Sequence, residues 1–178
     1  MGLPIEQVPQ MGRNVKCILR LSRPVWEGTG FTPEASTNGI TQYTWVPGQG
    51  AKTDGTVGLT LFSGSVWAER WRTMPHEQRP REGIAALSPA LPQLSDATKA
   101  SMFVDWVAMD RFQASYSFPA PGQVTSMGPT LVDGLQDGNA PFLFAGEHTS
   151  YAFIGYMEGA LSSGVRVARQ LAERLARA

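Results

Sequence analysis

The residues with the clearest chemical potential lie in the turn Gly146–Ser150, GEHTS, which separates an apolar run from a long helical pattern. The run Phe142–Ala145 has the length and density of a strand buried on both faces. A helix start leaves backbone N–H groups without partners, and its dipole favours negative charge. The strand, turn and helix start together fit either an anion or cofactor site or a purely structural connection, and the spacing alone names no ligand.

The helical pattern after this turn carries one apolar stripe at three- and four-residue steps. Such a stripe predicts an amphipathic helix with its apolar face buried. The stripe consists of Met157, Ala160, Leu161, Val165, Ala168, Leu171, Ala172 and Leu175. Arginines crowd the last turns opposite the stripe, where cations complement the negative end of the helix dipole.

The preceding chain predicts the elements that must position this segment. Alternating apolar residues in Asn14–Leu21, NVKCILRL, predict a strand with one buried face. Further strands are predicted at 57–63, at 101–108 and around 42–45. Helices are predicted at 65–72 and between 76 and 87, and a glycine-studded connection is predicted at 122–138. This mixture predicts an α+β, or mixed α/β, fold.

Composition excludes several classes of function. The 178 residues carry a formal net charge of zero, so neither a nucleic acid nor an anionic membrane is indicated as a partner. With only two histidines and one cysteine, a clustered His/Cys metal site is not expected. Cys17 has no cysteine partner within the chain, which indicates a reducing compartment and a cytoplasmic location.

A longer motif around the turn names a family. The segment GEHTSYAFIGYMEGALSSGVRVA resembles the C-terminal flavin-binding signature of the flavin-dependent amine oxidases, which include monoamine, polyamine and L-amino-acid oxidases. The resemblance extends from about Asn14 onward: NVKCILRLSRPVW resembles the lysine-bearing strand of the family, and Trp106 followed by Ala114-Ser115-Tyr116 resembles a segment placed against the flavin ring.

The resemblance implies three catalytic residues. Lys16 corresponds to the family lysine that holds a water near flavin N5, although a strand lysine is ordinarily a solvated or snorkelling residue. Tyr116 and Tyr156 correspond to two aromatic residues that face each other across the substrate amine, where the negative potential of their ring faces can orient it. The alternative for this pair is two buried tyrosines with hydrogen-bonded hydroxyls.

The resemblance also implies the residues that bind FAD. Trp106, Ser115, Gly146, Glu147, Tyr156 and Met157 correspond to the family's cofactor contacts. Glu147 is expected to accept hydrogen bonds from ribityl hydroxyls, and the backbone N–H of Met157 is expected to face the pyrimidine end of the flavin. Because Ser115 stands where some members carry a flavin-linked cysteine, non-covalent FAD is expected. Trp106 taken alone is an ordinary core residue, and His148 is expected to be a turn residue without a catalytic role.

The family's other FAD element, a strand–GxGxxG–helix unit, is missing from this sequence. The chain is therefore expected to supply part of a FAD site, with an N-terminal FAD-binding half or subunit as its partner and poor FAD binding on its own. Residues 1–138 are expected to belong to an antiparallel substrate domain, and residues 139–178 to the FAD-binding domain. The resemblance also allows a homodimer of the complete enzyme.

The implied function is oxidative deamination of an amine with dioxygen, giving an imine and hydrogen peroxide. Two alternatives remain open at this point. An L-amino-acid oxidase needs a cation, usually arginine, for the substrate carboxylate, and neither Arg20 nor Arg111 lies in an assignable motif. A catalytically silent interaction fragment is the other alternative, and it predicts that no flavin binds even with a partner present.

Overall fold

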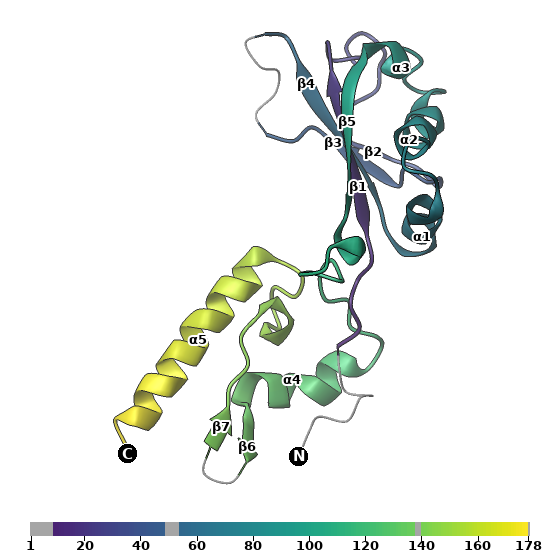
Figure 1. Ribbon diagram of the computed structural model, residues 1–178. Coiled ribbons are helices and arrows are strands. Elements are labelled where there is room, and N and C mark those ends of the chain that lie inside the picture. Colours follow the sequence, from purple (N-terminus) through teal and green to yellow (C-terminus); the bar gives the residue numbers. More distant parts are fainter. Residues whose placement is uncertain (1–8, 49–53, 138–139, 178) are drawn as a thin grey trace. The chain divides into compact units, whose positions relative to one another are not determined.

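A computed structural model describes residues 9–48, 54–137 and 140–177 (Figure 1). The chain forms two compact units. One unit is Arg13–Ser115, and the other combines the residues before it with those after it. The predicted boundary at residue 138 refers to domains of a complete enzyme and stays a prediction.

The unit Arg13–Ser115 is built on a five-stranded sheet in which every pairing is antiparallel. Its strand order is β2-β3-β4-β1-β5. The strands are β1 (Val15–Leu21), β2 (Ala35–Ser36), β3 (Tyr43–Trp45), β4 (Val57–Ser63) and β5 (Thr98–Asp105). This confirms the predicted class, an antiparallel sheet combined with helices, and the strands expected at 14–21, 42–45 and 57–63.

Helices cover one face of this sheet, as Figure 1 shows. They are α1 (Ser65–Thr73), α2 (Arg79–Leu87) and the single turn α3 (Leu94–Ala97). Alternate residues of β1 turn toward them and are fully buried: Val15, Cys17, Leu19 and Leu21. The alternation arises because successive side chains of a strand point to opposite faces.

Trp71 of α1 fills the centre of this core. Its ring is fully buried, and its indole N–H donates to the carbonyl of Arg79 at 2.7 Å. Gly83 of α2 lies against the ring, because a Cβ at that position would come within 2.6 Å of it. Burial raises the pKa of the neighbouring Cys17 thiol to about 12, so the thiol is neutral at physiological pH.

The second unit contains two helices and a small ribbon. Its elements are α4 (Gln123–Asp133), β6 (Leu135–Asp137), β7 (Ala140–Phe142), the 3-10 turn η3 (Glu147–Thr149) and α5 (Met157–Leu175). The predicted terminal helix is confirmed. The glycine-studded connection predicted at 122–138 is wrong over Gln123–Asp133, where α4 forms. The spacing of Val124, Met127 and Leu131 is the helical signal in this segment.

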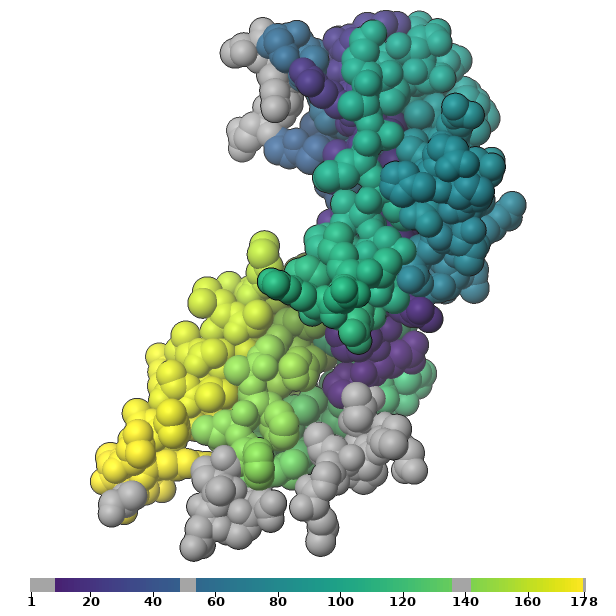
Figure 2. All heavy atoms as spheres, in the orientation of Figure 1, coloured from purple at the N-terminus to yellow at the C-terminus, as the bar shows by residue number. Residues whose placement is uncertain are grey.

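Two predictions about the ribbon and the terminal helix are wrong. The strand expected at Phe142–Ala145 ends at Phe142, and Phe142 and Ala145 are exposed. The apolar stripe of α5 is also exposed: Met157 at 91%, Leu161 at 65% and Leu175 at 69%. Figure 2 shows the atoms of α5, in yellow, uncovered on the face in view. Periodicity shows which residues share a face, but it does not show what covers that face.

The strand predicted at 101–108 is also misplaced. Strand β5 begins earlier, at Thr98, and ends at Asp105, after which Trp106–Ala108 form the 3-10 turn η2. Asp105 ends the strand because its side chain accepts a hydrogen bond from the N–H of Ala108 at 3.2 Å. Within the residues that the structure describes, no helix is both long and apolar enough to cross a membrane.

Two glycines of α5 give a matched test of this packing. A Cβ at Gly159 would overlap the carbonyl oxygen of Phe153, whereas a Cβ at Gly164 would meet no atom within 4 Å. Gly159→Ala should therefore lower the free energy of unfolding by about 1–3 kcal/mol. Gly164→Ala should raise it by about 0.5–1 kcal/mol through helix propensity. Urea denaturation measures both, and changes of the same sign would contradict the packing described for Gly159.

Candidate functional site

The turn between β7 and α5 begins at a residue that must be glycine. Gly146 has φ +141° and ψ 162°, a conformation that side chains disfavour. A Cβ there would also lie 2.5 Å from the His148 ring. The Gly146 N–H donates to the hydroxyl of buried Ser163 at 2.9 Å, which connects the start of the turn to α5.

Glu147 accepts three hydrogen bonds within this unit. Its Oε1 accepts from the Ser117 N–H at 2.8 Å, and its Oε2 accepts from the Gly155 N–H at 2.7 Å and from the Ser117 hydroxyl. Burial opposes ionisation of Glu147, but these three hydrogen bonds and the neighbouring His148 hold its pKa below the usual 4.5. The carboxylate is therefore charged at neutral pH.

Arg166 of α5 secures the other side of the turn. Its guanidinium donates to the carbonyl of Val132 at 2.6 Å, to the carbonyl of Phe144 at 2.9 Å and to the Thr149 hydroxyl at 2.9 Å. The planar fork of arginine suits several acceptors at once. This arginine therefore joins α4, the end of the ribbon and η3 to the terminal helix.

The segments of Tyr116 and Tyr156 are both hydrogen-bonded to Glu147. The donor Ser117 directly follows Tyr116, and the donor Gly155 directly precedes Tyr156. The side chains are 38% and 69% exposed, respectively, so they are not the pair of buried core tyrosines considered from the sequence. Met157 begins α5, and no side-chain hydrogen bond caps that helix start. Two aromatic faces and a helix N-terminus are thus open near one turn.

In the unit Arg13–Ser115, Lys16 lies on the sheet face that the helices do not cover. The register places it opposite Phe62 of β4 and Val104 of β5. Its ammonium lies 5.4 Å from the centroid of the Trp45 ring, an attractive cation–π arrangement. The side chain is half-buried, with its stem over aromatic surface.

Trp106 and Ser115 belong to this same unit. Trp106 is half-buried in η2 and packs edge-on against Phe112, with ring centroids 5.7 Å apart. The Ser115 hydroxyl accepts a hydrogen bond from the buried Asn14 side chain at 2.7 Å. Asp105, which caps η2, also pairs with Arg72 through two hydrogen bonds of 2.8 and 2.9 Å.

The structure thus divides the predicted site residues between the two units. Lys16, Trp106 and Ser115 lie in the first, and Tyr116, Gly146, Glu147, Tyr156 and Met157 lie in the second. Within the second unit, Glu147 connects the chain beside Tyr116 to the chain beside Tyr156. Sequence reasoning missed Ser117, Gly155, Arg166 and Asn14 as partners, because hydrogen bonds between distant residues leave no periodic signal.

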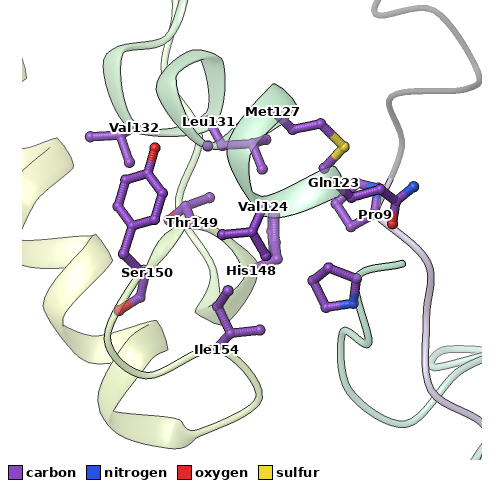
Figure 3. A pocket seen from close by; sticks show the side chains of 13 residues that line it. Pro9, Gln123, Val124, Met127, Leu131, Val132, His148, Thr149, Ser150 and Ile154 are labelled. Carbon is purple, nitrogen blue, oxygen red and sulfur yellow. The ribbon is translucent and has the colours of Figure 1, made fainter. Parts of the chain in front are cut away.

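A small apolar pocket also lies in the second unit, between α4 and the turn. Figure 3 shows Val124, Met127 and Leu131 of α4 on one side and Thr149 and Ile154 on the other. None of the predicted site residues lines it. Across ranges 9–48, 54–137 and 140–177, no three His, Cys, Asp or Glu side chains are grouped to hold a metal ion.

The open tyrosine faces and the start of α5 offer two different kinds of ligand contact. Exposed aromatic faces attract an amine, while a helix start favours negative charge.

Comparison with known proteins gives consistent matches over nearly the whole chain. The sequence profile of the family described as flavin containing amine oxidoreductase matches residues 4–172. A probable flavin-containing monoamine oxidase A of Dictyostelium discoideum is 24% identical over 181 residues, which cover 96% of this chain and 37% of that protein.

Solved structures show the same fold. Cyclohexylamine oxidase from Brevibacterium oxydans matches with a TM-score of 0.79 and 24% identity, over 98% of this chain and 39% of that one. A double mutant of putrescine oxidase matches with a TM-score of 0.81 and 17% identity, over 97% of this chain and 38% of that one. The chain thus spans less than two-fifths of the length of each of these relatives.

The lowered pKa of Glu147 predicts a pH-dependent contribution to stability. Glu147→Gln should cost about 1–2 kcal/mol of unfolding free energy at neutral pH, because hydrogen bonds to a charged, partly exposed group are lost. The carboxylate pKa is lower in the folded state, so this advantage over the variant is complete above about 4.5 and is lost as pH falls through the folded-state value. Urea denaturation of both proteins across this range measures the difference. A difference that does not change with pH would show that the charge of Glu147 has no part in stability.

Proposed function

The chain belongs to the flavin containing amine oxidoreductase family, and on that premise we propose that it forms the C-terminal part of a FAD-dependent amine oxidase. The proposed reaction oxidises an amine with dioxygen to an imine and hydrogen peroxide, and the imine then hydrolyses to an aldehyde with release of ammonia or an amine. One observation carries this proposal: a single carboxylate joins the segments of two exposed tyrosines beside a helix start, in a chain of this family.

The residues present fit FAD as the cofactor. The start of α5 has no side-chain hydrogen-bonding cap, so its first backbone N–H groups can face a ligand. A carboxylate has about four acceptor positions. Three are used within this chain, so Glu147 retains capacity for a ribityl hydroxyl. When bound, FAD supplies the redox step by accepting hydride from the amine-bearing carbon and passing the electrons to dioxygen.

The other proposed contacts with the flavin lie in the unit Arg13–Ser115. Lys16 would hold a water toward flavin N5, with its stem fixed over aromatic side chains. Trp106 would contact the cofactor from η2, where Asp105 caps the turn. Ser115 cannot form the thioether that a cysteine forms, and its hydroxyl is already bonded to Asn14. Both points favour non-covalent FAD.

Tyr116 and Tyr156 are proposed to bind the substrate amine between their ring faces. Their exposure leaves both faces accessible to a ligand. An amine without a carboxylate is favoured, because two tyrosine ring faces attract an amine but supply no cation for a carboxylate. The oxidases among the matched structures are described as acting on cyclohexylamine and on putrescine.

A partner is proposed for the exposed stripe of α5. We propose that the FAD-binding part of the complete enzyme covers this face, with residues 139–178 belonging to that domain and 1–138 to the substrate domain. Two observations support this: the exposure of Leu161 and Leu175, and the spans of 37% and 39% that the chain occupies in its relatives. Without that part, this chain should bind FAD poorly and be inactive. A cytoplasmic location and a homodimer of the complete enzyme belong to the same proposal.

Flavin absorbance tests the proposal directly. The purified chain should be colourless alone and yellow when co-expressed with a FAD-binding part, and the complex should release peroxide when an amine is added. Yellow protein from the chain alone would overturn the partial-site proposal. Absence of flavin in both samples would overturn the oxidase proposal and favour a silent fragment. Oxidation of amino acids but not of simple amines would favour an L-amino-acid oxidase.

The proposed role of Lys16 predicts a kinetic effect without loss of cofactor. Lys16→Met keeps an apolar stem of similar length but removes the ammonium. Amine turnover should fall by about a hundredfold or more, the scale of a positioned group that acts in proton transfer. The ratio of flavin to protein absorbance should be unchanged. Lys99→Met, an exposed lysine on β5, is the matched control and should retain turnover. Equal activity of the two variants would exclude the role proposed for Lys16.

A further inference from the structure

Glu147 is fixed by residues that are distant from it in sequence. Its partners are Ser117, thirty residues upstream, and Gly155, eight residues downstream. Both backbone partners are N–H donors, and the Ser117 hydroxyl is a third donor. Hydrogen bonds to an ionised carboxylate are roughly twice as strong as neutral ones, so this carboxylate is the strongest polar link between the two segments.

Each partner of Glu147 adjoins a tyrosine. Ser117 follows Tyr116, and Gly155 precedes Tyr156. Gly155 has φ +83°, and a Cβ there would lie 3.7 Å from Cδ2 of Tyr116, so the two segments are close neighbours. The two segments are not paired in a helix or a sheet, because neither belongs to a helix or to a strand of a sheet.

The segment of Tyr116 is also held from its other side. The Gly12 N–H donates to the Tyr116 carbonyl at 2.6 Å, and the Phe118 N–H donates to the Gln10 carbonyl at 2.7 Å. The Tyr116 backbone is therefore fixed against residues 10–12, and the Glu147 carboxylate fixes the Tyr156 backbone against it. Removing the carboxylate would therefore loosen the backbone of one tyrosine from that of the other.

We propose that Glu147 is a positioning residue that sets the spacing of Tyr116 and Tyr156, and thereby the affinity for the substrate amine. The inference rests on the proposed function, since it assigns Glu147 a role in substrate binding that acts through the tyrosines. This role is additional to the expected ribityl contact. Glu147→Gln keeps the size of the side chain but replaces one acceptor oxygen with an NH₂ group that cannot accept the Gly155 or Ser117 N–H.

The positioning itself can be measured without catalysis. In the ¹⁵N-labelled chain, the amide protons of Ser117 and Gly155 should both move upfield in Glu147→Gln, because each loses or weakens a charge-assisted hydrogen bond. Glu173→Gln, an exposed carboxylate on α5, is the control and should leave both resonances in place. Amide resonances that do not respond to Glu147→Gln would overturn the inference.

The catalytic consequence is tested in the flavin-loaded enzyme with its FAD-binding part. Glu147→Gln should lower kcat/KM for the amine by tenfold or more, chiefly through KM, and Ser117→Ala should give a smaller loss because both backbone donors remain. In a background with Tyr116→Leu and Tyr156→Leu, Glu147→Gln should cause little further loss, because residues that act as a unit are not additive.

Two results would overturn the inference. An undiminished loss in the tyrosine-substituted background, together with a fall in bound flavin, would show that Glu147 acts on the cofactor alone. An enzyme that binds flavin but oxidises no amine would overturn the proposed function and, with it, the substrate role of Glu147. In that case the amide resonances would still decide whether the carboxylate holds the two segments together.

Discussion

The second unit depends on two charged side chains, whose hydrogen bonds join one irregular turn to the segments around it. The carboxylate of Glu147 accepts from Ser117 and Gly155, and the guanidinium of Arg166 donates to the Phe144 carbonyl and the Thr149 hydroxyl. A turn outside helices and strands has no ladder to occupy its N–H and C=O groups, and leaving them unpaired is costly. The two charged side chains pair several such groups and hold the turn to the segments of Ser117 and Gly155 and to α5.

The first unit holds Lys16 on the surface of a sheet whose other face is packed. Strand β1 pairs with β4 on one side and β5 on the other, and its alternate side chains are buried in the core beneath three helices. Lys16 therefore projects from a strand whose other face is fully buried, beside Trp45 and Phe62. A close-packed core resists small displacements, so the backbone that carries Lys16 is well fixed.

Similarity to the amine oxidases extends over nearly all of this chain but over less than two-fifths of its relatives. A helix in a globular protein normally buries its apolar face. The exposed stripe of α5 is therefore consistent with a chain that matches only part of its relatives. Exposed apolar residues on this scale mark an interaction surface. The proposed FAD-binding part would cover the apolar helix face that the described chain leaves exposed.

The sequence by itself determined the local features: the alternation that makes β1 a one-sided strand, the period of α5 and the turn chemistry at Gly146. These follow from neighbours a few residues apart, which a linear pattern records. It also carried the motif that identifies the family. The tertiary structure alone decided that Glu147 bonds to Ser117 and that the α5 stripe is exposed. The physical reason is that hydrogen bonds and burial depend on groups far apart in sequence, brought together only by the folded chain, and such contacts impose no period on the sequence.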